Sequence, residues 1–125
     1  MTTDLSFRIA RVDEGAPVVR VHGELDAFTS PALEEALRSF TGSPPLVDLR
    51  GCPFVDSHGL TALVGAARRA RRRGATLVVV CDDPAVRRVF EVTGLAGLFD
   101  LVAVPAFANA AVSADLGPEE APAAR

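Results

Sequence analysis

The residues with the clearest chemical potential in this 125-residue chain lie together in Asp56-Ser57-His58-Gly59. A serine hydroxyl can act as a nucleophile or accept a phosphoryl group, and the neighbouring histidine invites comparison with serine hydrolases. Adjacent residues of a helix point in different directions, however, so Ser57 and His58 are poorly placed to share a proton. The Gly-x-Ser-x-Gly elbow of hydrolases is also absent. The stretch therefore favours modification or recognition over catalysis by the chain itself.

The same stretch stands where an apolar strand and its connector lead into a long helix. Asp56 is a natural N-cap, which places Ser57 at the first helical position. Backbone N–H groups at a helix start lack intrahelical partners, and the macrodipole adds partial positive charge there. A phosphate on Ser57 would carry roughly −1.5 to −2 charge and would lie near such groups. The spacing alone equally fits a plain helix cap, with Gly59 allowing a tight turn, and it favours that simpler interpretation.

Two other sets of residues are weaker candidates. Asp48 ends a predicted parallel strand, as the acceptor aspartate of a response regulator does. That fold also needs an acidic pair after its first strand and a late lysine, and this chain has no suitable pair and no lysine. Cys52 and Cys81 follow no metal-ligand spacing and are expected to be buried thiols. We therefore predict no metal and no cofactor.

A basic cluster ends the long helix, and it could bind nucleic acid or an acidic membrane surface. Its members are Arg68, Arg69, Arg71, Arg72 and Arg73. Such a run is more often the solvated end of a helix, where it also complements the C-terminal dipole. The formal net charge is −3 and the chain has no Trp or Tyr, so direct nucleic-acid binding is not predicted. A partner with an acidic rim stays open as an alternative.

The pattern of apolar residues predicts the elements that position this chemistry. Alternation from Leu5 to Val12, then an apolar run from Val18, predicts an antiparallel hairpin. The chain then alternates between helical periodicity and short apolar runs. The predicted order is β-β-α-β-α-β-α-β-α, with helices at about 29–40, 57–73, 84–92 and 105–114 and strands at 46–49, 77–81 and within 98–104. That order predicts an α/β fold with a mixed, mostly parallel sheet. Thr29 or Ser30 is expected to cap the first helix.

Length and composition predict a single domain over residues 1–112. Gly, Pro, Glu and Ala dominate residues 113–125, which are expected to form a disordered tail. The chain shows no secretory signal and no apolar stretch of roughly 20 residues, the length needed to span a bilayer. We therefore expect a cytoplasmic protein without a membrane span.

Three motifs in register resemble the STAS-domain anti-sigma factor antagonists. Val47-Asp48-Leu49 followed by Phe54-Val55-Asp56-Ser57-His58-Gly59-Leu60 is similar to the signature loop of that family. Gly23-Glu24-Leu25-Asp26 and the segment 84–95 agree with it, and the likeness covers about residues 5–110. The resemblance implies that an anti-sigma factor with serine-kinase activity phosphorylates Ser57. It implies that the unmodified protein binds this factor and frees a sigma factor, and that a phosphatase resets the switch.

The resemblance also implies which residues contact the partner, and that the chain itself is not an enzyme. The expected contacts are Gly23, Glu24, Asp26, Asp56, Ser57, His58, Gly59 and Leu60. The rest of the 24–28 loop, and arginines near Arg68, extend this predicted interface. His58 stands where the family usually has Ser or Thr. This departure leaves a second hypothesis open, in which the chain is a constitutive STAS subunit, a scaffold or a transporter-associated module, that is never phosphorylated.

Overall fold

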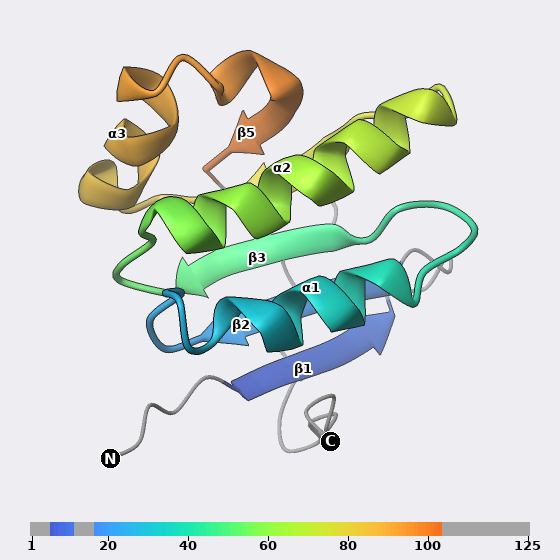
Figure 1. Ribbon diagram of the computed structural model, residues 1–125, viewed down its shortest axis with the longest axis horizontal. Helices are drawn as coiled ribbons and strands as arrows, with labels where there is room; N and C mark the ends of the chain where they lie inside the picture. Colours follow the sequence, from blue (N-terminus) through green and yellow to red (C-terminus); the bar gives the residue numbers. More distant parts are fainter. Residues whose placement is uncertain (1–5, 12–16, 104–125) are drawn as a thin grey trace.

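The computed structural model describes residues 6–11 and 17–103, with side chains from residue 17 onward. It contains a five-stranded sheet in the order β1-β2-β3-β4-β5 (Figure 1). The strands are β1 (Ser6–Arg11), β2 (Pro17–His22), β3 (Leu46–Gly51), β4 (Leu77–Val80) and β5 (Phe99–Val102). β1 pairs antiparallel with β2, and each later neighbour is parallel to the one before. The predicted hairpin and the mostly parallel mixed sheet are confirmed.

Helices connect the parallel strands, as expected for crossovers between neighbours in such a sheet. They are α1 (Ser30–Arg38), α2 (Ser57–Arg72) and α3 (Pro84–Val92), with a short 3₁₀ turn η1 (Ala96–Leu98) before β5. Figure 1 shows α1 and α2 running side by side across one face of the sheet. The predicted helix over 105–114, the residues that join the two strands of the predicted hairpin (12–16) and the predicted tail over 113–125 lie outside the described residues.

The main core lies between that face and the helices. Alternate strand residues such as Val19, Val47 and Val79 are fully buried against Leu63 of α2 and Phe90 of α3. Full burial of one such side chain stabilises the fold by about 1.5–3 kcal/mol. The opposite face of the sheet carries a smaller buried cluster of Val18, Leu46 and Val80. Val79 and Val80 thus point to opposite faces and both are buried, so β4 is covered on both sides.

The ends of α2 follow from its sequence. Asp56 is the N-cap, as predicted, and Gly74 follows the helix at φ +79°. The N–H of Gly74 donates to the carbonyl of Arg71, and the N–H of Ala75 donates to that of Ala70. Glycine adopts this left-handed conformation without a steric penalty, which is why it ends so many helices. The longest helix is therefore fixed in register at both ends.

Candidate functional site

The loop after β2 and the loop after β3 are joined by backbone hydrogen bonds at the carboxyl edge of the sheet. Leu25 and Val55 form an isolated parallel bridge beyond the ends of the two strands. The N–H of Leu25 donates to the carbonyl of Phe54 at 2.9 Å, and the carbonyl of Leu25 accepts from the N–H of Asp56 at 3.1 Å. Parallel strands end at the same edge, so the two loops meet there (Figure 1). The two motifs that are separate in the sequence thus form one surface.

Gly23 begins the first loop in a conformation that other residues rarely adopt. Its φ is +100°, and its N–H donates to the carbonyl of Gly51 at 3.0 Å. The chain turns out of β2 here, and Glu24 is left exposed on the loop. Gly23 therefore shapes the loop through its backbone.

Asp26 organises the rest of that loop. Its Oδ1 accepts hydrogen bonds from the N–H groups of Phe28 at 3.0 Å and Thr29 at 3.1 Å. Thr29 is the N-cap of α1, but its side chain makes no capping hydrogen bond. Its Oγ1 instead donates to the carbonyl of Glu24 at 2.8 Å and accepts from the N–H of Asp26 at 2.9 Å. The prediction that Thr29 or Ser30 caps the helix through its hydroxyl is therefore wrong, because the Thr29 hydroxyl is used to close the loop and Ser30 makes no such bond.

Asp56 caps α2 from the second loop. Its Oδ1 accepts hydrogen bonds from the N–H groups of His58 at 2.8 Å and Gly59 at 3.0 Å. Partial burial raises the pKa of this carboxyl, but the bonds from Gly59 and His58 and the nearby imidazole outweigh that effect and hold the pKa below its usual value. Asp56 is therefore a carboxylate at neutral pH and is committed to the helix start.

Ser57 is the first residue of α2 and is exposed. Its carbonyl accepts from the Thr61 hydroxyl at 2.8 Å, while its own hydroxyl makes no hydrogen bond to the described residues. The side chain of His58 is 63% exposed, and its Nδ1 lies 3.7 Å from Asp56 Oδ2. The imidazole thus faces Asp56. Ser57 therefore lacks a general base that is hydrogen-bonded to its hydroxyl, which a nucleophilic serine needs.

Gly59 and Leu60 lie inside the molecule. A Cβ added to Gly59 would lie 2.6 Å from Leu25 Cγ and 2.8 Å from the Leu25 carbonyl oxygen. Gly59 is not in the left-handed region, so it serves close packing of α2 on the first loop, and the tight-turn interpretation is wrong. Leu60 is 5% exposed and belongs to the core. Both residues position the surface on which Ser57 and His58 are presented.

The sequence pattern does not predict the exposure of two aromatic side chains beside this surface. Phe28, in the first loop, is 86% exposed, and Phe54, in the second, is 47% exposed. Both stand in connecting loops, outside any helical or strand periodicity, and that position is the signal in the sequence that could have found them.

Asp48 is not available as a phosphate acceptor. Its side chain is fully buried, and Arg50 holds it through three hydrogen bonds: the backbone N–H and Nε donate to Oδ1, each at 3.0 Å, and Nη2 donates to Oδ2 at 2.8 Å. Arg20 adds a fourth contact at 3.4 Å. Burial raises the pKa of Asp48, but the hydrogen bonds and positive charge of Arg50, together with Arg20, outweigh it and lower that pKa. Asp48 is therefore a structural ion-pair partner, in agreement with the rejection of the response-regulator alternative.

Both cysteines are buried free thiols. Burial raises the pKa of Cys52 to about 11, so this thiol stays protonated and unreactive at neutral pH.

Over residues 6–11 and 17–103, the structure contains no group of three or more His, Cys, Asp or Glu side chains that could hold a metal ion. Within these ranges, every helix falls short of the length and apolar character that a membrane span requires.

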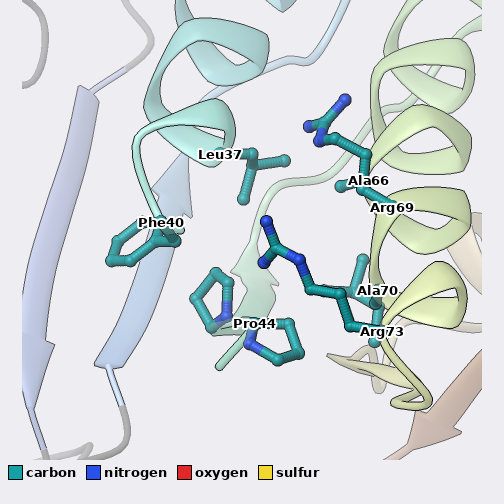
Figure 2. Close-up of a pocket in the computed structure, with 9 residues that line it drawn as sticks. Leu37, Phe40, Pro44, Ala66, Arg69, Ala70 and Arg73 are labelled. Atoms are coloured by element: carbon teal, nitrogen blue, oxygen red, sulfur yellow. The ribbon is translucent and has the colours of Figure 1, made fainter. Parts of the chain in front are cut away.

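A small pocket lies away from Ser57, between the C-terminal halves of α1 and α2 (Figure 2). Leu37, Phe40 and Pro44 line one side, and Arg69 of α2 and Arg73, the C-cap of that helix, reach into it from the other. Its volume is about 20 Å³, room for a single water. The Arg73 guanidinium donates to the Gly42 carbonyl at 2.9 Å, so part of the basic cluster ties the helix end to a neighbouring loop.

Comparisons with known proteins agree with this architecture. The STAS domain family model matches residues 8–111. An anti-sigma-B factor antagonist of Listeria monocytogenes is 33% identical over 101 residues, which cover 78% of this chain and 89% of that protein. A crystal structure of an anti-sigma factor antagonist from Mycobacterium paratuberculosis superposes with a TM-score of 0.74 at 33% identity, covering 87% of this chain and 94% of that one.

A more distant structure shares the fold. The phosphorylated form of the Bacillus cell fate determinant SpoIIAA superposes with a TM-score of 0.59 at 22% identity, over 78% of this chain and 92% of that chain. The expectation drawn from the three sequence motifs is thus confirmed by the family model, by a sequence relative and by a solved structure. The chain belongs to the STAS domain family, within which its relatives are anti-sigma factor antagonists.

Proposed function

We propose that this chain is an anti-sigma factor antagonist whose binding to an anti-sigma factor is switched by phosphorylation of Ser57. The observation that carries the proposal is an exposed serine hydroxyl at the first position of α2, on a surface built from two loops joined by hydrogen bonds. The names of the relatives support the partner class. The unmodified chain would bind the anti-sigma factor and so release a sigma factor.

The phosphorylation chemistry belongs to the partner. An anti-sigma factor with serine-kinase activity would transfer the γ-phosphoryl group of ATP to Ser57 Oγ: the Oγ–P bond forms, the bond from phosphorus to ADP breaks, and a base of the kinase takes the serine proton. Asp56 cannot serve well as that base, because its carboxylate is occupied by two N–H groups and its pKa is lowered. A phosphatase would hydrolyse the phosphoserine and restore the binding form.

The phosphate would change the surface more than the fold. The N–H groups of His58 and Gly59 already donate to Asp56 Oδ1, and that of Leu60 donates to the Asp56 carbonyl. The helix start therefore offers a phosphate fewer free donors than its sequence suggests. The added charge of roughly −1.5 to −2 would stay exposed beside Asp56, with Glu24 and Asp26 on the adjoining loop. A loss of a few kcal/mol on binding would weaken affinity by two or three orders of magnitude, at 1.4 kcal/mol per tenfold.

The test is phosphorylation of the full-length chain by candidate anti-sigma kinases from the same organism. The chain is incubated with each kinase and ATP, and intact mass and peptide mapping locate the phosphate. We expect one phosphoryl group on Ser57, none on Ser57→Ala, and normal modification of Ser43→Ala, which alters an exposed serine in the loop before β3. Tight binding of the anti-sigma factor that is unchanged by Ser57→Glu would contradict the switch.

The constitutive STAS subunit remains the second candidate, and the observation in its favour is His58. A histidine at this position is exposed and paired with Asp56, where the family usually has a hydroxyl residue. That candidate predicts tight binding of a scaffold or transporter partner and no phosphate on Ser57 with any kinase tested. Genes that neighbour the coding sequence offer an independent check, because a kinase-like anti-sigma factor favours the switch and transporter subunits favour the alternative.

A further inference from the structure

Two exposed phenylalanines stand on the joined loops, Phe28 in the first loop and Phe54 in the second, which leads to Ser57. Phe28 is 86% exposed and Phe54 is 47% exposed, whereas Phe90 and Phe99 are buried and stack edge to face in the core. The part of each ring that is left in water contributes nothing to the stability of the fold. Aromatic side chains are enriched among the residues that contribute most to protein–protein binding, where burial of the ring supplies the energy.

The backbone that carries each ring is already fixed. The carbonyl of Phe54 accepts from Leu25 at 2.9 Å, and the N–H of Phe28 donates to Asp26 Oδ1 at 3.0 Å. Leu25 is itself fully buried. Because the loops need little ordering, binding of a partner would lose less conformational entropy than binding to a flexible loop would.

We propose that Phe28 and Phe54 are the apolar anchors of the interface and insert into an apolar recess on the anti-sigma factor. The inference rests on the proposed function and adds the chemistry by which the partner is recognised. Phe28 and Phe54 belong to the two loops that are joined at Leu25 and Val55, and the second loop leads directly to Ser57, so both residues adjoin the proposed interface. A phosphate on Ser57 then blocks binding because a dianion beside the rings would have to lose its water against an apolar surface.

The charges on the loops favour an apolar recess over a basic one. Glu24, Asp26 and Asp56 already make this edge acidic. A partner with a basic recess would be attracted by these carboxylates and would bind the phosphorylated form more tightly, which is the opposite of a switch that releases the partner. An apolar recess would bury the rings and leave these carboxylates hydrated at its rim.

The first test measures the Kd of the full-length chain for the anti-sigma factor that phosphorylates Ser57. We expect Phe28→Ala and Phe54→Ala each to weaken binding about 30-fold or more, the size of effect typical of an aromatic anchor. Val92→Ala is the matched control, because Val92 is a large apolar residue that is 69% exposed at the far end of α3, and its Kd should not change. Phe28→Ala and Val92→Ala should keep the wild-type midpoint of thermal unfolding, because both side chains are mostly exposed. Phe54→Ala should lower the midpoint modestly, because about half of that residue is buried, and should still unfold in one cooperative transition.

The second test separates desolvation from charge repulsion. The ratio of Kd for phosphorylated and unmodified chain is measured from about 0.1 M to about 1 M salt, which shortens the screening length from about 10 Å to about 3 Å. We expect the ratio to change less than about threefold, because desolvation of the phosphate is not screened. A ratio that collapses toward one at high salt would show repulsion by an acidic partner and would overturn the apolar recess.

The outcomes distinguish this inference from the function on which it rests. If the wild-type chain binds the anti-sigma factor and both phenylalanine variants bind as Val92→Ala does, the anchors are wrong and the antagonist function stands. If no anti-sigma factor binds the wild-type chain, the proposed function fails and the anchors fail with it.

Discussion

Two aspartates build the candidate site by the same local chemistry on neighbouring loops. Asp26 and Asp56 each accept two consecutive N–H groups through Oδ1, so each carboxylate fixes the backbone that follows it. Asp56 was predictable as a cap because it directly precedes a helical periodicity. The role of Asp26 was not predictable in this detail, because Thr29 is an equally good capping residue by type, and only the fold shows that its hydroxyl bonds to Glu24 instead.

Gly59 gives a test of how closely the two loops are packed. Gly59→Ala should lower the free energy of unfolding by about 1–3 kcal/mol, because the new Cβ overlaps the fixed backbone and side chain of Leu25. Chemical denaturation with a two-state fit measures this change. Gly65→Ala, also in α2, is the matched control, because its Cβ would meet only the Arg69 side chain at 3.5 Å. The free energy of unfolding of that control should rise by up to about 1 kcal/mol, because alanine has a higher helix propensity than glycine. Equal stabilisation of both variants would show that the contact with Leu25 is loose.

At the scale of the elements, periodicity predicted nearly every helix and strand within the described residues. The apolar run at 77–81 and the stripe of Leu60, Leu63 and Ala67 are strong signals because burial on a helix or strand repeats with a fixed period. The packing of α2 against α1 was less predictable. The arginines at the end of α2 look like a uniform solvated cluster in sequence, yet Arg73 bonds to a loop and Arg69 is partly buried beside the pocket.

Arg69 should be a cost to stability at that helix interface. Its Nη2 is buried with no hydrogen-bond partner among the described residues. Burial lowers its pKa, and the charges of Arg38, Arg72 and Arg73 add to this effect. Arg69→Met keeps an apolar stem in the same place and removes the unpaired charge. A buried group without a hydrogen-bond partner lowers the free energy of unfolding by about 1–3 kcal/mol, and Arg69→Met removes that cost. The substitution also removes the favourable interaction of Arg69 with the C-terminal dipole of α2, which takes back about 0.3–1 kcal/mol.

We therefore expect Arg69→Met to raise the free energy of unfolding by roughly 1 kcal/mol. Arg68→Met alters the exposed neighbour and should change stability by less than about 0.5 kcal/mol in either direction. Thermal and urea unfolding of both variants and of the wild type give these changes in the free energy of unfolding. A loss of stability for Arg69→Met would mean that its guanidinium has a partner, such as a bound water or anion, in the pocket.

Across the whole molecule, the proposed binding surface and the groups that stabilise the fold lie on different parts of the sheet. The carboxyl edge carries the loops with Ser57, the helical face carries the main core, and the opposite face carries the ion pair of Asp48 with Arg50. The mixed, mostly parallel sheet follows from the order of elements in the sequence, whereas the spatial order β1-β2-β3-β4-β5 was not predicted, because a strand–helix–strand unit fixes the hand of its crossover and not which strand lies beside which. The Asp48–Arg50 pair could not be predicted in the same way. Residues two apart on a strand point to the same face, so a contact was possible, but the sequence alone does not show that this face is covered and that the pair is buried. Asp48 was thus considered for chemistry that its burial forbids.

That ion pair should set the response of the whole fold to acid. The pKa of Asp48 is lowered in the folded state, whereas in the unfolded chain this carboxyl titrates near 3.8. The folded chain therefore takes up a proton on Asp48 at a lower pH than the unfolded chain does. The stability from the pair is therefore fully present above about pH 5 and is lost as the pH falls below that range. Loss of one partner of a buried pair costs about 3–5 kcal/mol. Because the Arg50 side chain is 27% exposed and can be rehydrated, we expect Asp48→Asn to cost about 2–3 kcal/mol at pH 7.

The pH dependence distinguishes a lost ion pair from a general packing defect. Urea unfolding of wild type and Asp48→Asn from pH 7 to pH 3 should show a constant gap in stability at neutral pH that narrows in acid, because protonation of Asp48 imitates the substitution. Asp100→Asn is the control, since Asp100 is exposed on β5 and its strand register places it on the same face of the sheet. Its gap should stay near zero throughout. A gap for Asp48→Asn that is equally wide at pH 3 would assign the role of Asp48 to shape and hydrogen bonding, with its charge contributing nothing.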